Sequence, residues 1–141
     1  MRHEEALVRA FIKPDKRRRY LDRLASPKTR QKFMTQHFHH MGDLDERYAE
    51  RLDPHMPLVE FGKRREAHNE RIYEELRRRG APDECYVMSA SSSLDGQQVA
   101  LRDALDHVVG WHDGTFISCI PGKLAYFEGE ELNERYILER P

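Results

Sequence analysis

The most apolar pattern in the chain runs from residue 114 to residue 128, where β-branched and aromatic residues outnumber charged ones. Side chains alternate between the two faces of a strand, and both faces of 115–120 are largely apolar, which predicts a central strand covered on both sides. A second strand, 124–128, follows Pro121 and Gly122, which suit the centre of a type II turn. Because tight hairpins favour the primed turn types, we expect a hairpin with a wider loop.

The first half of the chain has helical patterns instead. Apolar positions recur at helical spacing in 2–12 and 14–25. Ser26 and Pro27 predict the cap and first turn of a third helix, which we expect to end at Gly42. A short helix is expected to begin with Asp43 as N-cap and Glu46 as its capping-box partner. A longer, highly charged surface helix is expected over 58–79.

Strand signals dominate the second half. The run 85–90 predicts a buried strand, and 99–109 predicts an amphipathic helix that ends before Gly110. The last strand, 135–139, has charged ends, which suit a sheet edge. We expect strands 85–90 and 115–120 to be adjacent and parallel, joined by a crossover helix. The predicted fold class is α+β, a helical N-terminal half packed on a small mixed sheet (β-α-β-β-β) formed by the C-terminal half.

Composition changes this picture little. Charged residues make up 35% and hydrophobic residues 38% of the 141 positions, which predicts a small core for this length. We expect a single domain, 1–141, with a helical region over 1–80 and a strand-rich region over 83–141, because the second region alone would bury little surface. Neither a membrane span nor a secretory signal is indicated, and two cysteines are too few for a disulfide framework. These features favour a cytoplasmic protein.

Charge is distributed unevenly although the formal net charge is −1. Residues 9–32 hold ten Lys or Arg and two Asp, a local charge of +8, whereas 80–141 hold four Lys or Arg and eleven Asp or Glu, a local charge of −7. The asymmetry predicts a polyanionic partner, either nucleic acid or an acidic protein surface. It also fits a basic half that docks on its own acidic half, or on that of a second copy in a homo-oligomer. The residues predicted to contact the partner are Lys16, Arg17, Arg18, Arg19, Arg23, Lys28, Arg30 and Lys32.

A second candidate site follows from the predicted parallel strands. The loops after them would meet at one edge of the sheet, where α/β proteins bind ligands. Hydroxyls, backbone amides and one ammonium group would then converge on a phosphate or carboxylate. The residues of this predicted anion site are Ser91, Ser92, Ser93 and Lys123. The alternative is ordinary turn chemistry, since these are residues that turns require.

Metal binding and catalysis have weaker signals. His37, His40 and Asp43 could share a helix face, but their spacing matches no strong zinc pattern, and histidines also suit a helix end. Cys85 and Cys119 fall inside predicted strands, where cysteine is usually an inert buried residue. We therefore predict no metal, no cofactor and no named catalytic residue. Two hypotheses remain: a non-catalytic binding or regulatory module that uses the basic face of 9–32, or a small enzyme or ligand-binding domain with an anionic small molecule at the serine edge.

Overall fold

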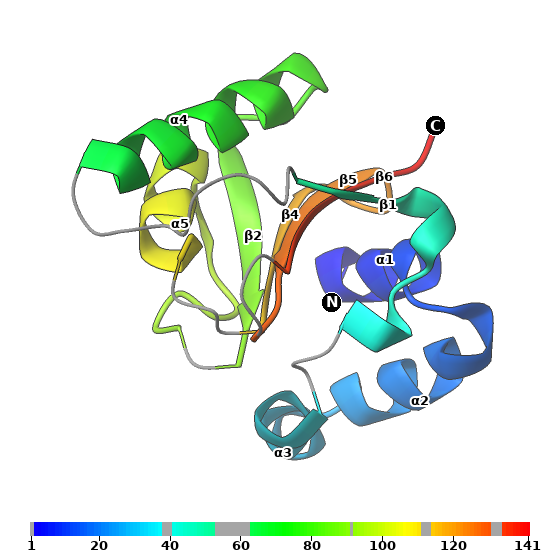
Figure 1. Cartoon of the computed structure of the whole chain (residues 1–141). Coiled ribbons are helices and arrows are strands. Elements are labelled where there is room, and N and C mark those ends of the chain that lie inside the picture. Colours follow the sequence, from blue (N-terminus) through cyan, green and yellow to red (C-terminus); the bar gives the residue numbers. More distant parts are fainter. Residues whose placement is uncertain (1, 38–40, 53–62, 91, 111–113, 131–133) are drawn as a thin grey trace.

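The computed structural model describes residues 2–37, 41–52, 63–90, 92–110, 114–130 and 134–141 (Figure 1). Three helices come first, α1 (Arg2–Phe11), α2 (Pro14–Leu24) and α3 (Pro27–His37). Both α2 and α3 begin at a proline, whose fixed φ suits the first helical position. Ser26 caps α3 as predicted: the Thr29 amide donates to its hydroxyl oxygen at 3.4 Å, and the Arg30 amide donates to its carbonyl oxygen at 2.9 Å.

The segment between α3 and the sheet departs from the prediction. Met41–Asp43 and Glu46–Tyr48 are short 3-10 helices, and a strand, β1 (Ala49–Arg51), follows. Asp45 caps the second of them, since its carboxylate accepts from the Arg47 amide at 3.2 Å. The predicted N-cap, Asp43, instead accepts from the Tyr20 hydroxyl at 2.6 Å, so the predicted capping box is wrong. Of the predicted helix 58–79, the structure describes α4 (Lys63–Arg78), and 58–62 lie outside the described residues.

The second half forms a sheet with one helix inserted. Its elements are β2 (Glu84–Ser89), β3 (Gln98–Ala100), α5 (Leu101–Val108), β4 (Thr115–Ile120), β5 (Leu124–Glu128) and β6 (Arg135–Glu139). Together with β1 they give a six-stranded sheet in the order β1-β6-β5-β4-β2-β3, and every neighbouring pair is antiparallel. The α+β class is confirmed. The predicted parallel pairing of β2 and β4, and with it the mixed sheet, is wrong.

The edges of the sheet also differ from the prediction. The edge strands are β1 and β3, each three residues long, whereas β6 lies inside the sheet between β1 and β5. Short edge strands limit the pairing groups left open to other chains. The hairpin β4–β5 has a three-residue loop, because Ile120 pairs with Leu124 across Pro121–Lys123, and a register shift lies between Ser118 and Ile120. The predicted wider loop is confirmed.

Helices cover both faces of the sheet, with α1, α2 and α3 on one face and α4 and α5 on the other (Figure 1). Alternation along β4 supplies both cores, since Phe116 packs with the first set of helices while Ile117 and Cys119 pack with the second. The central strand predicted from the sequence is therefore confirmed. None of the described helices is both long and apolar enough to cross a membrane.

Candidate functional site

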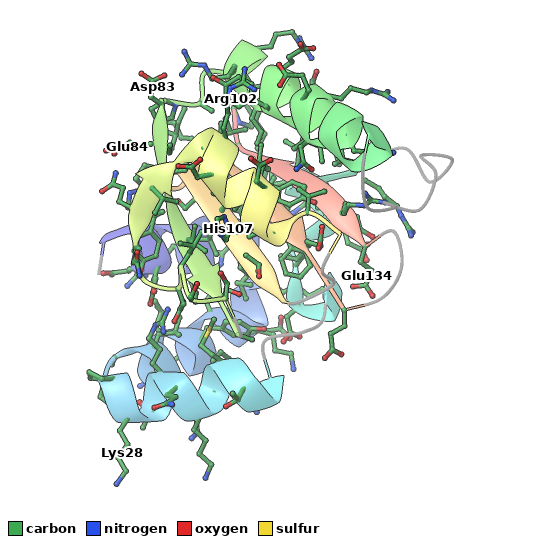
Figure 2. All side chains as sticks on the ribbon, turned by 90° about the vertical axis from the view of Figure 1, so that its left-hand side faces the viewer. Lys28, Asp83, Glu84, Arg102, His107 and Glu134 are labelled. Atoms are coloured by element: carbon green, nitrogen blue, oxygen red, sulfur yellow. The ribbon has the colours of Figure 1, made fainter. Side chains whose placement is uncertain are left out.

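Six cationic side chains on two adjacent helices form what we call the basic surface. Arg18, Arg19 and Arg23 on α2 are exposed, as are Lys28 and Lys32 on α3, and Lys16 on α2 is half-buried. Figure 2 shows Lys28 pointing from α3 away from the rest of the protein. Within the described residues, none of the six forms an ion pair with a carboxylate.

Arginines elsewhere in the described chain mostly have acidic partners. Arg79 contacts Glu75 and Glu50 at 2.8 Å and Glu139 at 3.0 Å. Arg102 on α5 pairs with Glu70 on α4 at 2.5 Å. Of these carboxylates only Glu139 belongs to the acidic region 80–141, and the other three lie earlier in the chain. The cations of the basic surface, in contrast, are left to solvent or to another molecule.

Two residues of the predicted basic tract bind inside the protein instead. The Arg17 Nε donates to the Ile12 carbonyl oxygen at 2.9 Å, and one of its terminal nitrogens lies 3.9 Å from the Asp45 carboxylate. Arg30 has a side chain that is 15% exposed and is bound by two carboxylates. Both residues therefore hold the fold together, and neither is available in the way that the sequence pattern predicts.

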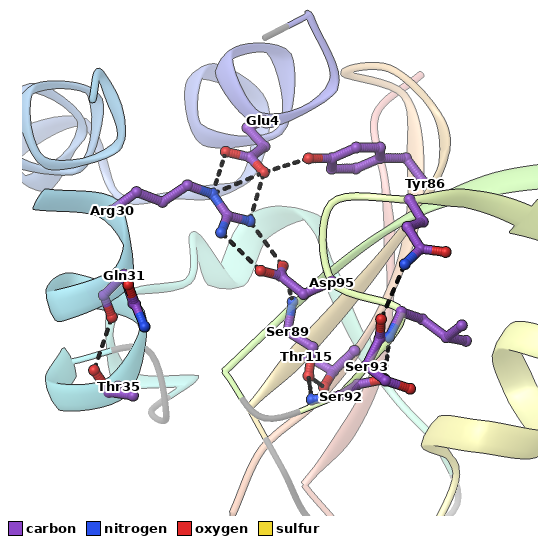
Figure 3. Close-up of polar contacts among 12 residues, drawn as sticks. Glu4, Arg30, Gln31, Thr35, Tyr86, Ser89, Ser92, Ser93, Asp95 and Thr115 are labelled. Atoms are coloured by element: carbon purple, nitrogen blue, oxygen red, sulfur yellow. Dashed lines mark hydrogen bonds and ion pairs between the residues drawn. The ribbon is translucent and has the colours of Figure 1, made fainter. Parts of the chain in front are cut away.

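Arg30 joins α1, α3 and the loop after β2 in a largely buried group (Figure 3). Its Nε and Nη2 donate to the Glu4 carboxylate at 3.0 Å and 2.8 Å, and both terminal nitrogens donate to Asp95 at 2.7 Å. Glu4 is 1% exposed and also accepts from the Tyr86 hydroxyl. We call Glu4, Arg30, Tyr86 and Asp95 the Arg30 cluster. Two carboxylates and one guanidinium give it a formal charge of −1.

The cluster fixes the protonation of Arg30 and Tyr86. Hydrogen bonds from Arg30, to Asp95 first and then to Glu4, raise the pKa of the guanidinium above its usual value despite burial. Burial, followed by the hydrogen bond to Glu4, raises the pKa of Tyr86 above its usual value. Arg30 therefore stays charged and Tyr86 stays a neutral donor at ordinary pH. An external anion would have to displace carboxylates to reach Arg30.

The loop after β2 is held in place by its own polar groups. The Asp95 carboxylate accepts from the Ser89 amide at 2.9 Å, and the Ser89 and Thr115 hydroxyls lie 2.7 Å apart. The Ser92 amide donates to the Ser89 hydroxyl oxygen, and the Leu94 amide donates to the Ser92 hydroxyl oxygen, each at 3.1 Å. These contacts are those of an Asx- and Ser-rich turn. They position Asp95 and Ser92 rigidly beside α3.

A cavity of about 560 Å³ lies between α3 and this loop. Its apolar lining residues include Leu24, Pro27 and Met34, and its polar lining residues include Gln31, Thr35, Tyr86, Ser89, Ser92 and Asp95. Figure 3 shows Gln31 and Thr35 on α3 facing Asp95, Ser89 and Ser92 across this space, with Arg30 bridging the two sides. The volume falls within the roughly 300–1,000 Å³ of small-molecule sites.

The two halves of the predicted anion site lie apart. Because β2 and β4 are antiparallel, with Ser89 opposite Thr115, the loop after β2 lies beside the start of β4. Lys123 follows the end of β4 and therefore lies at the other end of the strand pair. Ser92 and Ser93 are in the loop after β2, and Ser91 lies outside the described residues. The predicted convergence of these serines with Lys123 is wrong.

The remaining candidates are the histidines, Asp43 and the cysteines that the sequence offers as possible metal ligands or nucleophiles. His40 and the side chain of His37 lie outside the described residues, and Asp43 is bound by Tyr20. Among the residues that the structure describes, no group of three or more His, Cys, Asp or Glu could hold a metal ion. Cys85 and Cys119 are free and buried, as predicted. A hydrogen bond with Cys85, and then burial, raise the pKa of the Cys119 thiol, which is the opposite of an activated nucleophile.

Sequence reasoning missed Glu4 and Tyr86 as members of the site. A signal for Glu4 was present, because it lies three and four positions before Leu7 and Val8 and so shares the apolar face of α1. A carboxylate on a buried face needs a cationic partner, and here that partner is Arg30. Tyr86 carried no comparable signal, since aromatic residues are ordinary in strands.

Comparison of the chain with models of protein families, with curated proteins and with solved structures gives no match.

Proposed function

We propose that this protein is a non-catalytic binding module that holds the phosphate backbone of a nucleic acid on its basic surface. The observation that carries the proposal is the set of cations on α2 and α3 that have no ion pair within the described residues. Lys and Arg side chains that bind phosphates release condensed counterions, and this release drives association. The same chemistry suits an acidic protein surface, which is the alternative partner.

The other side chains of the molecule support binding over catalysis. The thiol of Cys119 is buried with a raised pKa. Tyr86 is held as a neutral donor to Glu4, and Arg30 is held between two carboxylates. The hydrogen bonds and ion pairs of Tyr86 and Arg30 are all made within the protein, and they hold α3 against the loop after β2. The basic surface is therefore presented on fixed helices.

The proposal is tested by binding of a labelled single-stranded oligonucleotide, and of a duplex of the same sequence, across a series of salt concentrations. We expect the logarithm of the affinity to fall linearly with the logarithm of the salt concentration. In a variant with Arg18→Ala, Arg19→Ala and Arg23→Ala, the slope should decrease by about one for each side chain that contacts a phosphate.

The matched control is the variant with Arg71→Ala and Lys123→Ala. Both residues are exposed cations outside the basic surface, and neither has an ion pair within the described residues. This variant should keep the wild-type slope. The proposal fails if the wild-type protein binds neither oligonucleotide, or if both variants lose affinity equally. Binding of poly-glutamate without binding of either oligonucleotide would assign the basic surface to an acidic protein instead.

A further inference from the structure

The cavity beside Arg30 opens next to the basic surface. Three residues of that surface, Arg23, Lys28 and Lys32, are sequence neighbours of the cavity-lining residues Leu24, Pro27 and Gln31. Successive residues on a helix are separated by about 100°, so Lys28 and Lys32 lie together along one side of the α3 face that lines the cavity, and Arg23 precedes the lining residue Leu24 on α2. A chain of phosphates that contacts them therefore passes close to the mouth of the cavity.

The interior of the cavity is unsuited to a phosphate. The Arg30 cluster carries a formal charge of −1, and its only guanidinium is already bound by Glu4 and Asp95. A negatively charged wall instead favours a neutral group that donates hydrogen bonds. The cavity thus complements the basic surface. The basic surface binds negatively charged groups, and the cavity accepts hydrogen bonds from neutral donors.

Two polar groups in the cavity are open to a ligand. Asp95 accepts three hydrogen bonds from Arg30 and Ser89 within the described residues, and a carboxylate offers about four acceptor positions. Its side chain is 27% exposed. The Gln31 side chain is exposed and has no hydrogen-bond partner within the described residues, so it offers both a donor and an acceptor. Leu24 on α2 and Pro27 and Met34 on α3 supply an apolar lining on the same side of the cavity as Gln31, and Asp95 lies on the other side.

We propose that this cavity binds one unpaired base of a single-stranded nucleic acid whose phosphates lie on the basic surface. The apolar lining contacts the base, and the polar groups of the base are bound from the two sides of the cavity, by Gln31 on α3 and by Asp95 in the loop after β2. The acceptor on Asp95 selects bases that carry an exocyclic amino group, such as cytosine and adenine. Single-stranded nucleic acid is recognised in this way, because unstacked bases expose both their faces and their edges. The inference rests on the proposed function and adds the strand state and base class of the ligand.

The test compares three ligands of equal length, oligo(dC), oligo(dT) and a strand of abasic sites, at one salt concentration. All three carry the same phosphates, and the abasic strand has no base. We expect oligo(dC) to bind about tenfold more tightly than the abasic strand and more tightly than oligo(dT), because one well-placed base contact contributes about that factor.

Gln31→Met removes the side-chain amide at an exposed helix position with little change in volume, so the variant should fold normally. It should lose most of the preference for oligo(dC) over the abasic strand and keep the salt dependence of the wild-type protein. The matched control is Gln98→Met on β3, an exposed glutamine outside the cavity lining, which should keep the preference.

The outcomes separate this inference from the function on which it rests. Equal, salt-dependent binding of oligo(dC), oligo(dT) and the abasic strand would overturn the base cavity and leave backbone binding intact. A base preference that Gln31→Met and Gln98→Met alter equally would also overturn it. Absence of binding to every oligonucleotide would overturn the proposed function together with the inference.

Discussion

At the scale of single residues, Arg30 has a different role from the cations that surround it in the sequence. Its guanidinium neutralises Glu4, whose side chain is 1% exposed. Replacing Arg30 by Met leaves a buried carboxylate without its counter-charge, which costs about 3–5 kcal/mol in the free energy of unfolding. Urea unfolding measures this loss. The exposed Arg23 is the control, and Arg23→Met should change the unfolding free energy by at most about 0.5 kcal/mol.

A second substitution separates charge from packing in the Arg30 cluster. Adding Glu4→Gln to Arg30→Met replaces the buried charge by a neutral amide, so some of the lost stability should return. If Arg30→Met were no more destabilising than Arg23→Met, the ion pairs of the cluster would contribute as little to the unfolding free energy as ion pairs on an exposed surface do. In that case Arg30 would belong to the basic surface after all, as the charge pattern of the sequence predicts.

At the scale of elements, the β4–β5 loop depends on one glycine. Gly122 has a φ of +73°, and the nearest atoms to a Cβ at this position, on Ala6 and Ala10, are at ordinary contact distances of 3.7–4.0 Å. Gly122→Ala should therefore be destabilising through its backbone conformation alone, by about 1–2 kcal/mol. Gly42→Ala is the control, because no atom lies within 4 Å of its Cβ position and its φ is not in the left-handed region. Equal melting temperatures for the two variants would contradict this account.

The elements also show what local pattern can and cannot predict. The limits of β4 and the starts of α2 and α3 follow from apolar alternation and from prolines, which act within a few residues. The direction of β2 against β4 depends on hydrogen bonds between residues far apart in sequence, and the three-residue strands β1 and β3 are too short to show alternation. Arg30 illustrates the same limit at the site, since its partners Glu4 and Asp95 lie 26 and 65 positions away. The exposed cations were predictable, and the cavity beside them was not.

At the scale of the whole molecule, buried tyrosines occur in both cores. Tyr20 packs with α1 and α3 on one face of the sheet, and Tyr126 lies in the core on the other face. Burial raises the pKa of both phenols above the usual value, with a further contribution from Asp43 for Tyr20 and from Glu128 for Tyr126. The pKa of Tyr86 in the Arg30 cluster is raised in the same way. Alkaline pH should therefore destabilise the cores on both faces of the sheet.

The sign of the pH effect follows from proton binding. In the unfolded chain these tyrosines lose their protons near pH ~10, whereas the folded protein keeps them protonated to higher pH. The stabilisation is complete below about pH 10 and is lost as the pH rises further, because the unfolded state then binds fewer protons than the folded state. Ionisation of each tyrosine lowers the free energy of unfolding by up to about 1.4 kcal/mol per pH unit. For the three tyrosines together the loss is up to about 4 kcal/mol per pH unit.

Urea unfolding at about pH 8 and about pH 11 measures this loss, and tyrosinate absorbance reports the ionisation directly. Tyr86→Phe should lower the stability at both pH values, because Glu4 loses a hydrogen-bond donor, and should reduce the steepness of the alkaline loss by about a third. If the chain is a single domain, both cores should unfold in one transition at either pH. A free energy of unfolding that is the same at the two pH values would mean that the tyrosines on both faces ionise as freely in the folded protein as in the unfolded chain.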